Sequence, residues 1–372
     1  MTGAHVAGLG TALPGPPLRQ QDLWTARFAE HFAFDRAAER IFLGAGVTTR
    51  HAAVNPIVED VSGWSTGARM RRYLVEALPL GKDAVAAALA DAGVAAEDVG
   101  LFAVATCTGY ATPGLDIRIA ADLGMAPDLQ RVLVGHMGCY AAIPGLSTVA
   151  DYVVSHRRPA VLLCCELTSL HAQPPSQPPG SPASAGTGGR VEGLRLAAAP
   201  DDRGQVVSHA LFGDGAAAVV VTPDPQARSL EILDVAALTD PGTSDLMTWD
   251  VTDLGFRMGL SPEVPRVLAR HVRGHVTALL HRHGYTVDDV DAWAVHPGGP
   301  RILDTVVEQL GLPPESVDAS WAVLAEYGNC SSTTVLLVLD ALRSLGRPRA
   351  GRPAVVTAFG PGLTLYTALL RG

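Results

Sequence analysis

Hydrophobic positions form two patterns along the chain: short continuous apolar runs, and longer stretches in which apolar residues recur at helical spacing. Runs of four to eight apolar residues bounded by glycine or proline indicate buried strands, and apolar residues spaced three or four apart indicate helices. The runs predict a strand and turn at 6–15, strands at 99–107 and 157–166, and a strand pair at 210–223 turning at Gly213–Gly215. The helical periods predict helices at 20–45, 82–93 and 115–124. This succession predicts an α/β fold.

The most informative stretch is 133–155, which predicts a buried strand, a glycine turn and then a helix. Cys139 falls at or next to the first residue of that helix. Free N–H groups and the positive end of a helix dipole favour an anion, so we expect a thiolate with a lowered pKa there. The alternative is a buried structural cysteine, since cysteine is among the most buried residue types.

The second half of the chain repeats the first. Residues 92–105 match 283–296 about 190 positions later, with Gly93 on Gly284 and Asp98 on Asp289. Gly138–Cys139 falls on Asn329–Cys330 at the same offset, and residues 157–164 match 351–358. Chance similarity between two alanine-rich segments is the competing explanation. Three collinear matches favour a duplicated unit, whose equivalent strand ends and helix starts converge where the halves meet.

That convergence predicts a reactive site. His296 closes a predicted strand at the repeat position of Ala105, and Asn329 opens a predicted helix beside the position equivalent to Cys139. Together with Cys139 they supply a nucleophile, a proton partner and two N–H donors for a developing oxyanion. Taken separately, His296 could be a buried core histidine and Asn329 a helix cap.

Composition narrows the class of protein. The 372 residues are 48% hydrophobic with a net charge of −9, which argues against nucleic acid as a partner but leaves room for a local basic patch. No apolar run approaches the ~18–20 residues of a membrane span, and residues 1–15 carry no secretory pattern. Five cysteines without metal-ligand spacing indicate reduced thiols and a cytoplasmic protein. Residues 172–204, rich in Pro, Gly, Ser and Ala, predict a long surface loop.

Four motifs then carry a family resemblance: VHPGGPRIL (295–303), YGNCSS (327–332), ALFGDGAA (210–217) and AFGPGLT (358–364). Over essentially the whole chain the sequence resembles the type III polyketide synthases, the chalcone synthase-like family, in its bacterial branch. The resemblance implies a thiolase-like fold of duplicated αβαβα layers. It implies an N-terminal half at 1–222 carrying the cysteine and a C-terminal half at 223–372 carrying the histidine and asparagine. It also implies a homodimer.

The resemblance implies roles for individual residues. Cys139 would carry the acyl and growing polyketide chain, while His296 and Asn329 would stabilise the enolate left when malonyl-CoA loses carbon dioxide. Phe212 matches a gatekeeper phenylalanine between a CoA tunnel and the cavity. The remaining implied positions are Met258 at the second gatekeeper site, Cys107, Thr112, Trp249 and His171 around the cavity, and Arg301 and Arg50 as CoA-binding candidates. Thr112 lies in the loop that the family inserts across the dimer interface.

The implied activity is iterative decarboxylative Claisen condensation of malonyl-CoA onto an acyl-CoA starter, followed by cyclisation. It needs no metal, no cofactor beyond the CoA thioesters and no acyl carrier protein. Residues 247–265 are most similar to those of bacterial enzymes that make alkylresorcinols or alkylpyrones from fatty acyl starters, and the resemblance therefore favours such products. Within the family the rival is a tetrahydroxynaphthalene-type synthase primed by malonyl-CoA. Outside it, the rivals are a ketoacyl-ACP synthase III, which performs one condensation, and a catalytically silent protein of the same fold.

Overall fold

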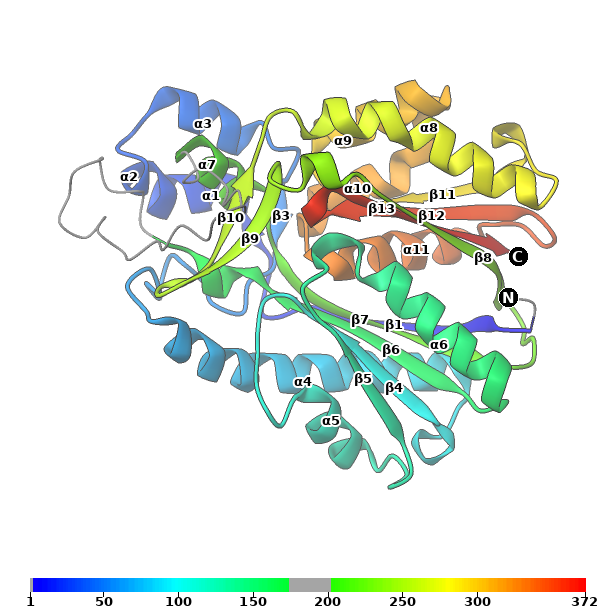
Figure 1. Ribbon diagram of the computed structural model, residues 1–372. Helices are drawn as coiled ribbons and strands as arrows, with labels where there is room; N and C mark the ends of the chain where they lie inside the picture. Colours follow the sequence, from blue (N-terminus) through cyan, green and yellow to red (C-terminus); the bar gives the residue numbers. More distant parts are fainter. Residues whose placement is uncertain (1–2, 174–201) are drawn as a thin grey trace.

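The computed structural model describes residues 3–173 and 202–372, and its centre is a nine-stranded sheet in the order β11-β12-β13-β8-β1-β7-β6-β4-β5 (Figure 1). The strands of this sheet are β1 (His5–Ala12), β4 (Leu101–Ala105), β5 (Gln130–Val134), β6 (Ala160–Leu167), β7 (Asp214–Thr222), β8 (Leu230–Thr239), β11 (Ala292–Val295), β12 (Pro353–Gly360) and β13 (Thr364–Arg371). Two small antiparallel ribbons pair β2 (Leu18–Arg19) with β3 (Thr49–Arg50) and β9 (Met247–Thr252) with β10 (Gly255–Leu260).

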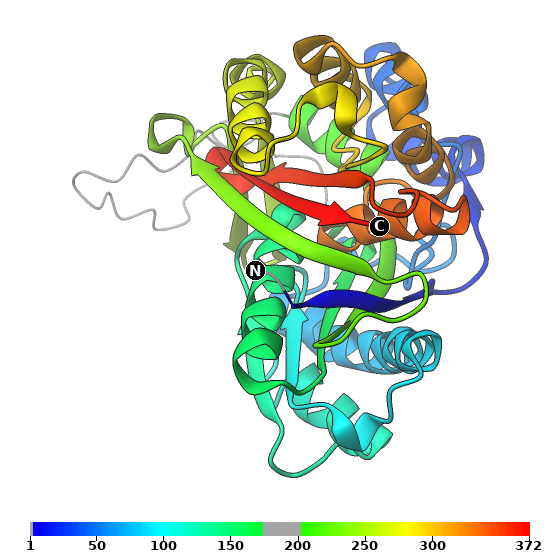
Figure 2. The same cartoon turned by 90° about the vertical axis from the view of Figure 1, so that its right-hand side faces the viewer.

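Helices cover this sheet on both sides and fill the space between its two halves (Figures 1 and 2). They are α1 (Gln20–Leu23), α2 (Ala29–His31), α3 (Arg36–Leu43), α4 (Thr66–Ala92), α5 (Leu115–Leu123), α6 (Ala142–His156), α7 (Asp202–Leu211), α8 (Val264–Arg282), α9 (Pro300–Leu310), α10 (Asp318–Tyr327) and α11 (Thr334–Ser344).

The predicted duplication is visible in the strand connectivity. In the first half β4 is parallel to β6, β6 is antiparallel to β7, and β7 is antiparallel to β1. In the second half β11, β12, β13 and β8 repeat the same three relationships. The halves join through β1 and β8, which pair at two positions only. The boundary predicted between 222 and 223 lies in the connection from β7 to β8, and the division into two domains there stays a prediction.

The layers are α, β, α, β, α, as predicted. Helices α6 and α11 form the central layer and share one apolar core with the inner faces of both half-sheets. Helices α4 and α5 cover the outer face of the first half, and α8 and α9 cover that of the second. Along β6, Leu162 and Cys164 point to the central layer while Leu163 and Cys165 point to α4, as the two-residue period of a strand requires.

The long helix α4 lies unusually close to β1, and glycine makes this possible. A Cβ on Gly10 would lie 2.3 Å from the backbone nitrogen of Ala88, so no larger residue fits there. The helix begins after Ser65, whose Oγ accepts from the Ala68 N–H, and ends at Gly93 with φ of +60°. It starts much earlier than the predicted 82–93 and ends where predicted.

Two other predicted segments differ from the structure. Residues 210–223 are not a strand pair: α7 runs to Leu211, and only β7 follows the glycine turn. The side chain of Gln205 in α7 donates to the Met258 carbonyl at 2.8 Å, a tertiary contact that a local pattern does not contain. The predicted helix at 20–45 is interrupted between α2 and α3. Most of the loop predicted at 172–204 lies outside the described residues, and its last residues belong to α7.

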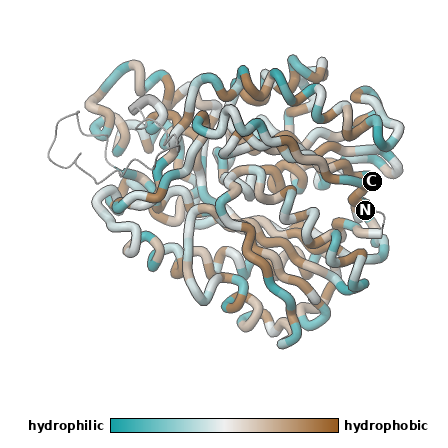
Figure 3. The backbone as a smooth tube through the Cα atoms, viewed as in Figure 1, coloured by the Kyte–Doolittle hydropathy of each residue, from teal (hydrophilic) through white to brown (hydrophobic). Residues whose placement is uncertain are grey.

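Hydrophobic residues follow the strands and the central helices, while polar residues lie mainly on the outer helices and turns (Figure 3). Among the described helices, none combines the length and apolar character that crossing a bilayer requires. All five cysteines are free. Over residues 3–173 and 202–372, no group of His, Cys, Asp and Glu side chains is arranged to hold a metal ion.

Candidate active site

Cys139 lies in a single 3-10 turn, Gly138–Tyr140, immediately before α6. The first position of this turn requires glycine, because Gly138 has φ of +68° and a Cβ there would lie 2.7 Å from Cδ of Pro361. Cys139 itself is buried, with 6% of its surface exposed. The cysteine is therefore placed just before the central helix of the first half, close to where the sequence predicts it.

Asn329 lies in the turn between α10 and α11 and contacts the Cys139 thiol. Its Oδ1 accepts from the backbone N–H of Ser331 at 2.9 Å and from Oγ1 of Thr334 at 3.4 Å. The side chains of Asn329 and Ser331 lie close enough to the Cys139 thiol to lower its pKa. Asn329 thus stabilises the turn, as the capping alternative supposes, and presents its amide to the cysteine as well.

His296 follows the last residue of β11, and its backbone N–H donates to the Thr357 carbonyl at 2.9 Å. Its ring packs edge-on against Phe359, with ring centroids 5.8 Å apart. The next residue, Gly360, lies against Cys139: a Cβ on it would be 3.3 Å from the Cys139 nitrogen. The end of β12 therefore lies between His296 and Cys139, and Asn329 lies near the Cys139 thiol. Among the described residues, no hydrogen bond joins the His296 side chain to Cys139 or Asn329.

The protonation states differ from the predicted thiolate. Burial raises the pKa of Cys139 to about 12, although the hydrogen bonds from Ser331 and Asn329 act in the opposite direction. Burial also lowers the pKa of His296 to about 3. In the resting site burial favours the uncharged form of both groups, and for the sulfur it acts against the effect of the nearby helix start. Burial thus opposes the lowered pKa expected from the helix start, and the resting thiolate stays a prediction.

A cavity of about 180 Å³ opens beside Cys139, and we refer to it as the main cavity. Three polar residues follow the end of β4 on one wall, and aromatic and aliphatic side chains form the rest. Its lining includes Thr106, Cys107, Thr108, Tyr110, Leu133, Cys139, Phe212, Trp249, Val251, Phe256, Met258 and Ser331. A second cavity of about 50 Å³ shares the Phe212, Trp249, Phe256 and Met258 wall and extends toward Leu18, Leu23 and Phe28.

Most predicted pocket residues lie on these two cavities. Phe212 and Met258 border both of them, as expected of residues between two compartments. Trp249 also borders both and donates from its indole Nε1 to the Cys107 carbonyl at 2.8 Å. The Cys107 thiol lies in the main cavity, 3.5 Å from Oγ of Ser331. His171 borders the second cavity.

Three predicted residues are placed differently. Thr112 is exposed and its hydroxyl donates to the Tyr110 hydroxyl at 3.2 Å, so within one chain it lies outside the main cavity. Arg301 is exposed on α9. Arg50 is buried, and its guanidinium donates to Gln20 and to the carbonyls of residues 209, 210 and 212. Those contacts give Arg50 a structural role in the wall of the second cavity, which it lines.

Sequence reasoning missed two residues beside Cys139. Ser331 hydrogen-bonds to both thiols of the site, and the YGNCSS motif already contains it. Glu166 is fully buried and accepts from Thr108 Oγ1 at 2.8 Å, Ser332 Oγ at 2.6 Å and the Cys107 N–H at 3.0 Å. Burial raises the pKa of this carboxyl. In the sequence, the signal that could have identified Glu166 was a single acidic residue near the end of an otherwise apolar strand.

Duplicated αβαβα layers with a cysteine before the central helix define a class, the condensing enzymes of the thiolase-like fold. Two family models identify the chain more closely. "Chalcone and stilbene synthases, N-terminal domain" matches residues 3–181, and "Chalcone and stilbene synthases, C-terminal domain" matches residues 233–372. The chain belongs to this family and is a type III polyketide synthase, an acyltransferase-type condensing enzyme. The family match decides against the ketoacyl-ACP synthase III alternative.

Curated relatives agree with this assignment over nearly the whole chain. A 1,3,6,8-tetrahydroxynaphthalene synthase from Streptomyces peucetius subsp. caesius is 36% identical over 377 residues, covering 99% of this chain and 93% of the relative. The alpha-pyrone synthesis polyketide synthase-like Pks18 of Mycobacterium tuberculosis is 32% identical over 379 residues, covering 98% and 90%.

Solved structures agree as well. The 1,3,6,8-tetrahydroxynaphthalene synthase of Streptomyces coelicolor A3(2) superposes with a TM-score of 0.86 at 26% identity, covering 99% of each chain. PKS-I from the brown alga Ectocarpus siliculosus gives a TM-score of 0.84 at 28% identity, covering 100% of this chain and 98% of the other.

Proposed function

We propose that Cys139 carries the acyl starter and the growing chain, with His296 and Asn329 stabilising the enolate formed from malonyl-CoA. The observation that supports this most directly is that the Asn329 side chain acts on the Cys139 thiol and lowers its pKa, beside a cavity of about 180 Å³. A donor fixed in advance at the oxygen that gains charge lowers the barrier more than water does, because water must first reorient.

The resting protonation states constrain the first step. Since both Cys139 and His296 are uncharged, the sulfur loses its proton to the imidazole as it attacks the starter thioester. The leaving CoA thiolate takes this proton from the imidazolium, and the neutral His296 keeps one N–H that can hydrogen-bond to the oxygen of the next thioester. Malonyl-CoA then loses carbon dioxide, and the resulting enolate attacks the carbonyl of the Cys139 thioester. The Cys139 sulfur leaves, and the chain, two carbons longer, is now on CoA. Transfer of this chain from CoA back to Cys139 starts the next round.

We propose an acyl-CoA starter and products of the alkylpyrone or alkylresorcinol type. Apolar side chains favour this: Leu133, Val251 and Phe256 line the main cavity, and the second cavity extends past Met258 toward Leu18, Leu23 and Phe28. An alkyl chain gains about 0.8 kcal/mol for each methylene that such walls bury. The similarity to an alpha-pyrone polyketide synthase points the same way.

A second candidate is a tetrahydroxynaphthalene-type synthase primed by malonyl-CoA. The polar wall of Thr106, Cys107, Thr108 and Ser331 favours it, because a poly-β-keto chain without an alkyl tail carries many carbonyl oxygens to satisfy. The 36% identity to a 1,3,6,8-tetrahydroxynaphthalene synthase supports the same candidate.

One assay separates the two candidates. Purified protein receives malonyl-CoA alone, or malonyl-CoA with acyl-CoA starters of increasing chain length, and products are identified by mass spectrometry. Acyl-primed pyrones or resorcinols support the first candidate, and a pentaketide naphthalene from malonyl-CoA alone supports the second. Requirement for an acyl carrier protein, or loss of activity with a metal chelator, would contradict the expected CoA-only chemistry.

We also propose that two copies of the chain associate where the main cavity opens. Strand β5 is an edge strand, and Leu133 on it, Tyr110 and Val251 are all more than half exposed around the cavity mouth. An exposed apolar edge strand is a surface that natural proteins cover. A Leu133→Asp variant should shift the mass in solution from dimer to monomer, and a wild-type monomer with full activity would contradict the proposal. With five free thiols, we propose the cytoplasm as its compartment.

A further inference from the structure

Residues 343–352, RSLGRPRAGR, concentrate positive charge on an otherwise acidic protein. They contain four arginines and no acidic residue, whereas the whole chain has 28 basic and 37 acidic residues and a net charge of −9. Salt screens exposed charges over about 8–10 Å, so a ligand at this stretch responds to the local charge more than to the net charge.

Five arginines, from the β7–β8 turn, from α11 and the turn after it, and from the end of β13, line one groove of about 490 Å³. They are Arg228, Arg343, Arg347, Arg349 and Arg371. We refer to it as the arginine groove. Glu231 is the one acidic side chain in its described lining, and a carboxylate on Gly372 would still leave the arginines in excess. The groove therefore offers cations to an anionic ligand.

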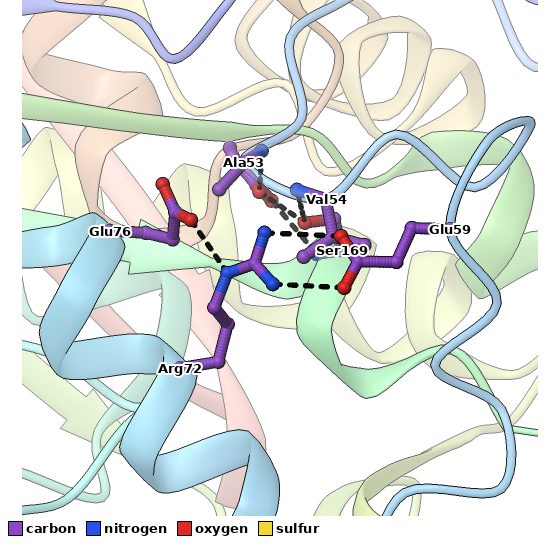
Figure 4. Close-up of polar contacts among 7 residues, drawn as sticks. Ala53, Val54, Glu59, Arg72, Glu76 and Ser169 are labelled. Atoms are coloured by element: carbon purple, nitrogen blue, oxygen red, sulfur yellow. Dashed lines mark hydrogen bonds and ion pairs between the residues drawn. The ribbon is translucent and has the colours of Figure 1, made fainter.

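Carboxylates of the protein compensate these arginines only in part. Asp291 accepts from Nη2 of Arg349 at 2.6 Å and lies 3.5 Å from Nε of Arg347, so one carboxylate serves two guanidinium groups. Figure 4 shows the opposite ratio elsewhere in the chain, where Arg72 lies between two glutamates. Arg228 donates to a backbone carbonyl of α11 at 3.2 Å and forms no ion pair within residues 3–173 and 202–372. Positive charge in the groove is thus left for a ligand to neutralise.

The arginines are also held in place before anything binds. The backbone N–H of Arg347 donates to the Leu342 carbonyl at 2.9 Å, and that of Arg349 donates to Oδ2 of Asp291 at 2.8 Å. Arg228 has φ of +64°, a conformation that a residue other than glycine keeps only where its surroundings enforce it. A groove fixed in this way loses little conformational entropy on binding.

The arginine groove lies at the opposite end of β12 from Cys139, where Figure 1 also marks the two ends of the chain. Arg371 pairs with Pro353 at the start of β12, whereas Gly360 at the end of β12 lies against Cys139. At ~3.3 Å per residue, the strand between these ends spans roughly 23 Å. Of the described residues that line the groove, none lines the main cavity or the second cavity. The groove is therefore separate from the candidate active site.

We propose that the arginine groove binds a small anion that carries a diphosphate group. A guanidinium presents its N–H donors in a planar fork that matches two oxygens of a phosphate. A phosphate group brings up to two charges and three acceptor oxygens, whereas a carboxylate brings one charge, so a diphosphate matches several clustered arginines better. The volume of the groove also leaves room for an organic group attached to the diphosphate. A long polyanion such as a nucleic acid would extend over the acidic remainder of the surface, which repels it.

The test titrates the full-length protein with pyrophosphate, ADP or citrate in a calorimeter at one fixed ionic strength. Pyrophosphate should bind once per chain, and Arg228→Gln and Arg347→Gln should each weaken it by about tenfold or more, since each removes charged hydrogen-bond donors. Citrate, which has carboxylates in place of phosphates, should bind more weakly than pyrophosphate. Tighter binding of ADP than of pyrophosphate would identify a nucleotide as the source of the diphosphate, and the reverse order would identify free diphosphate.

Arg266→Gln is the matched control, because Arg266 is an exposed arginine on α8 that pairs with Glu263 at 3.0 Å and lies outside the groove lining. It should bind pyrophosphate as the wild type does. Melting curves check folding, and pyrophosphate should raise the melting temperature of the wild type and of Arg266→Gln but not that of Arg228→Gln. The proposal is overturned if folded wild-type protein does not bind pyrophosphate, if citrate binds as tightly, or if all three variants weaken binding equally.

Discussion

Asn329 Oδ1 accepts a hydrogen bond from the backbone N–H of Ser331 at 2.9 Å, which fixes the orientation of the carboxamide. The carbonyl side is occupied by Ser331 and by Thr334, so the N–H₂ side faces the Cys139 thiol. The turn that follows α10 therefore directs a donor toward Cys139, as the proposed function requires.

Replacement of Asn329 by aspartate tests that donor. Asn329→Asp keeps an acceptor for the Ser331 N–H and the Thr334 hydroxyl but loses the N–H₂ group. Malonyl-CoA decarboxylation should fall about 10²–10³-fold, the usual effect of removing one oxyanion donor. Carbon dioxide release measures this, and the melting temperature shows whether the turn survives. Wild-type decarboxylation in a folded Asn329→Asp protein would contradict the assigned role.

Cys139→Ala separates the two halves of the reaction. The variant lacks the sulfur that carries the chain but keeps His296 and Asn329, so it should form no condensation product and still release carbon dioxide from malonyl-CoA. Product analysis and carbon dioxide release on the same sample check both expectations. Condensation in this variant would show that another residue is the nucleophile.

The raised pKa of Cys139 predicts how the resting enzyme reacts with iodoacetamide. Only the thiolate is alkylated, and a thiol with a pKa of about 12 is almost fully protonated at neutral pH. The alkylation rate of Cys139 should therefore rise about tenfold per pH unit from pH 7 to 10 without levelling off. Peptide mass spectrometry follows the modified residue. A plateau between pH 6 and 8 would instead indicate a resting thiolate paired with an imidazolium.

Changes at the wall between the two cavities should alter starter selection. Met258 is 7% exposed and borders both cavities, so Met258→Ala joins them and Met258→Phe narrows the passage. We expect Met258→Ala to raise kcat/KM for longer acyl-CoA starters about tenfold relative to short ones. Phe212→Leu, in the turn between α7 and β7, serves as a parallel variant. Equal changes for all starter lengths would argue against Met258 as a boundary.

The duplication and the positions of Cys139, His296 and Asn329 could be predicted because they depend on local signals. Both halves have glycines at equivalent helix ends and apolar strands at equivalent positions. Each of the three residues lies next to a strand end or a helix start. The protonation state of Cys139 could not be predicted, since the helix start is local but burial depends on the whole fold. The sequence pattern also did not predict α7, because the contact of its Gln205 with β10 joins residues far apart in the sequence.

The contacts that individual cavity residues make could not be predicted from the sequence either. Trp249 and His171 were predicted near the cavity, but their hydrogen bonds to the Cys107 and Thr108 carbonyls depend on how a separate ribbon lies against β4. Arg50 shows the converse: a loop arginine predicted to bind CoA is buried among backbone carbonyls.

The account depends on one sulfur atom that holds a lengthening chain, and mass spectrometry of the trapped enzyme tests it most directly. The protein is mixed with an acyl-CoA starter and malonyl-CoA, quenched within one turnover and digested. We predict that the peptide containing Cys139 carries the starter acyl group and the same group extended by successive two-carbon units, with no such adducts in Cys139→Ala. Adducts on a different residue, or extended products that form while Cys139 stays unmodified, would contradict it.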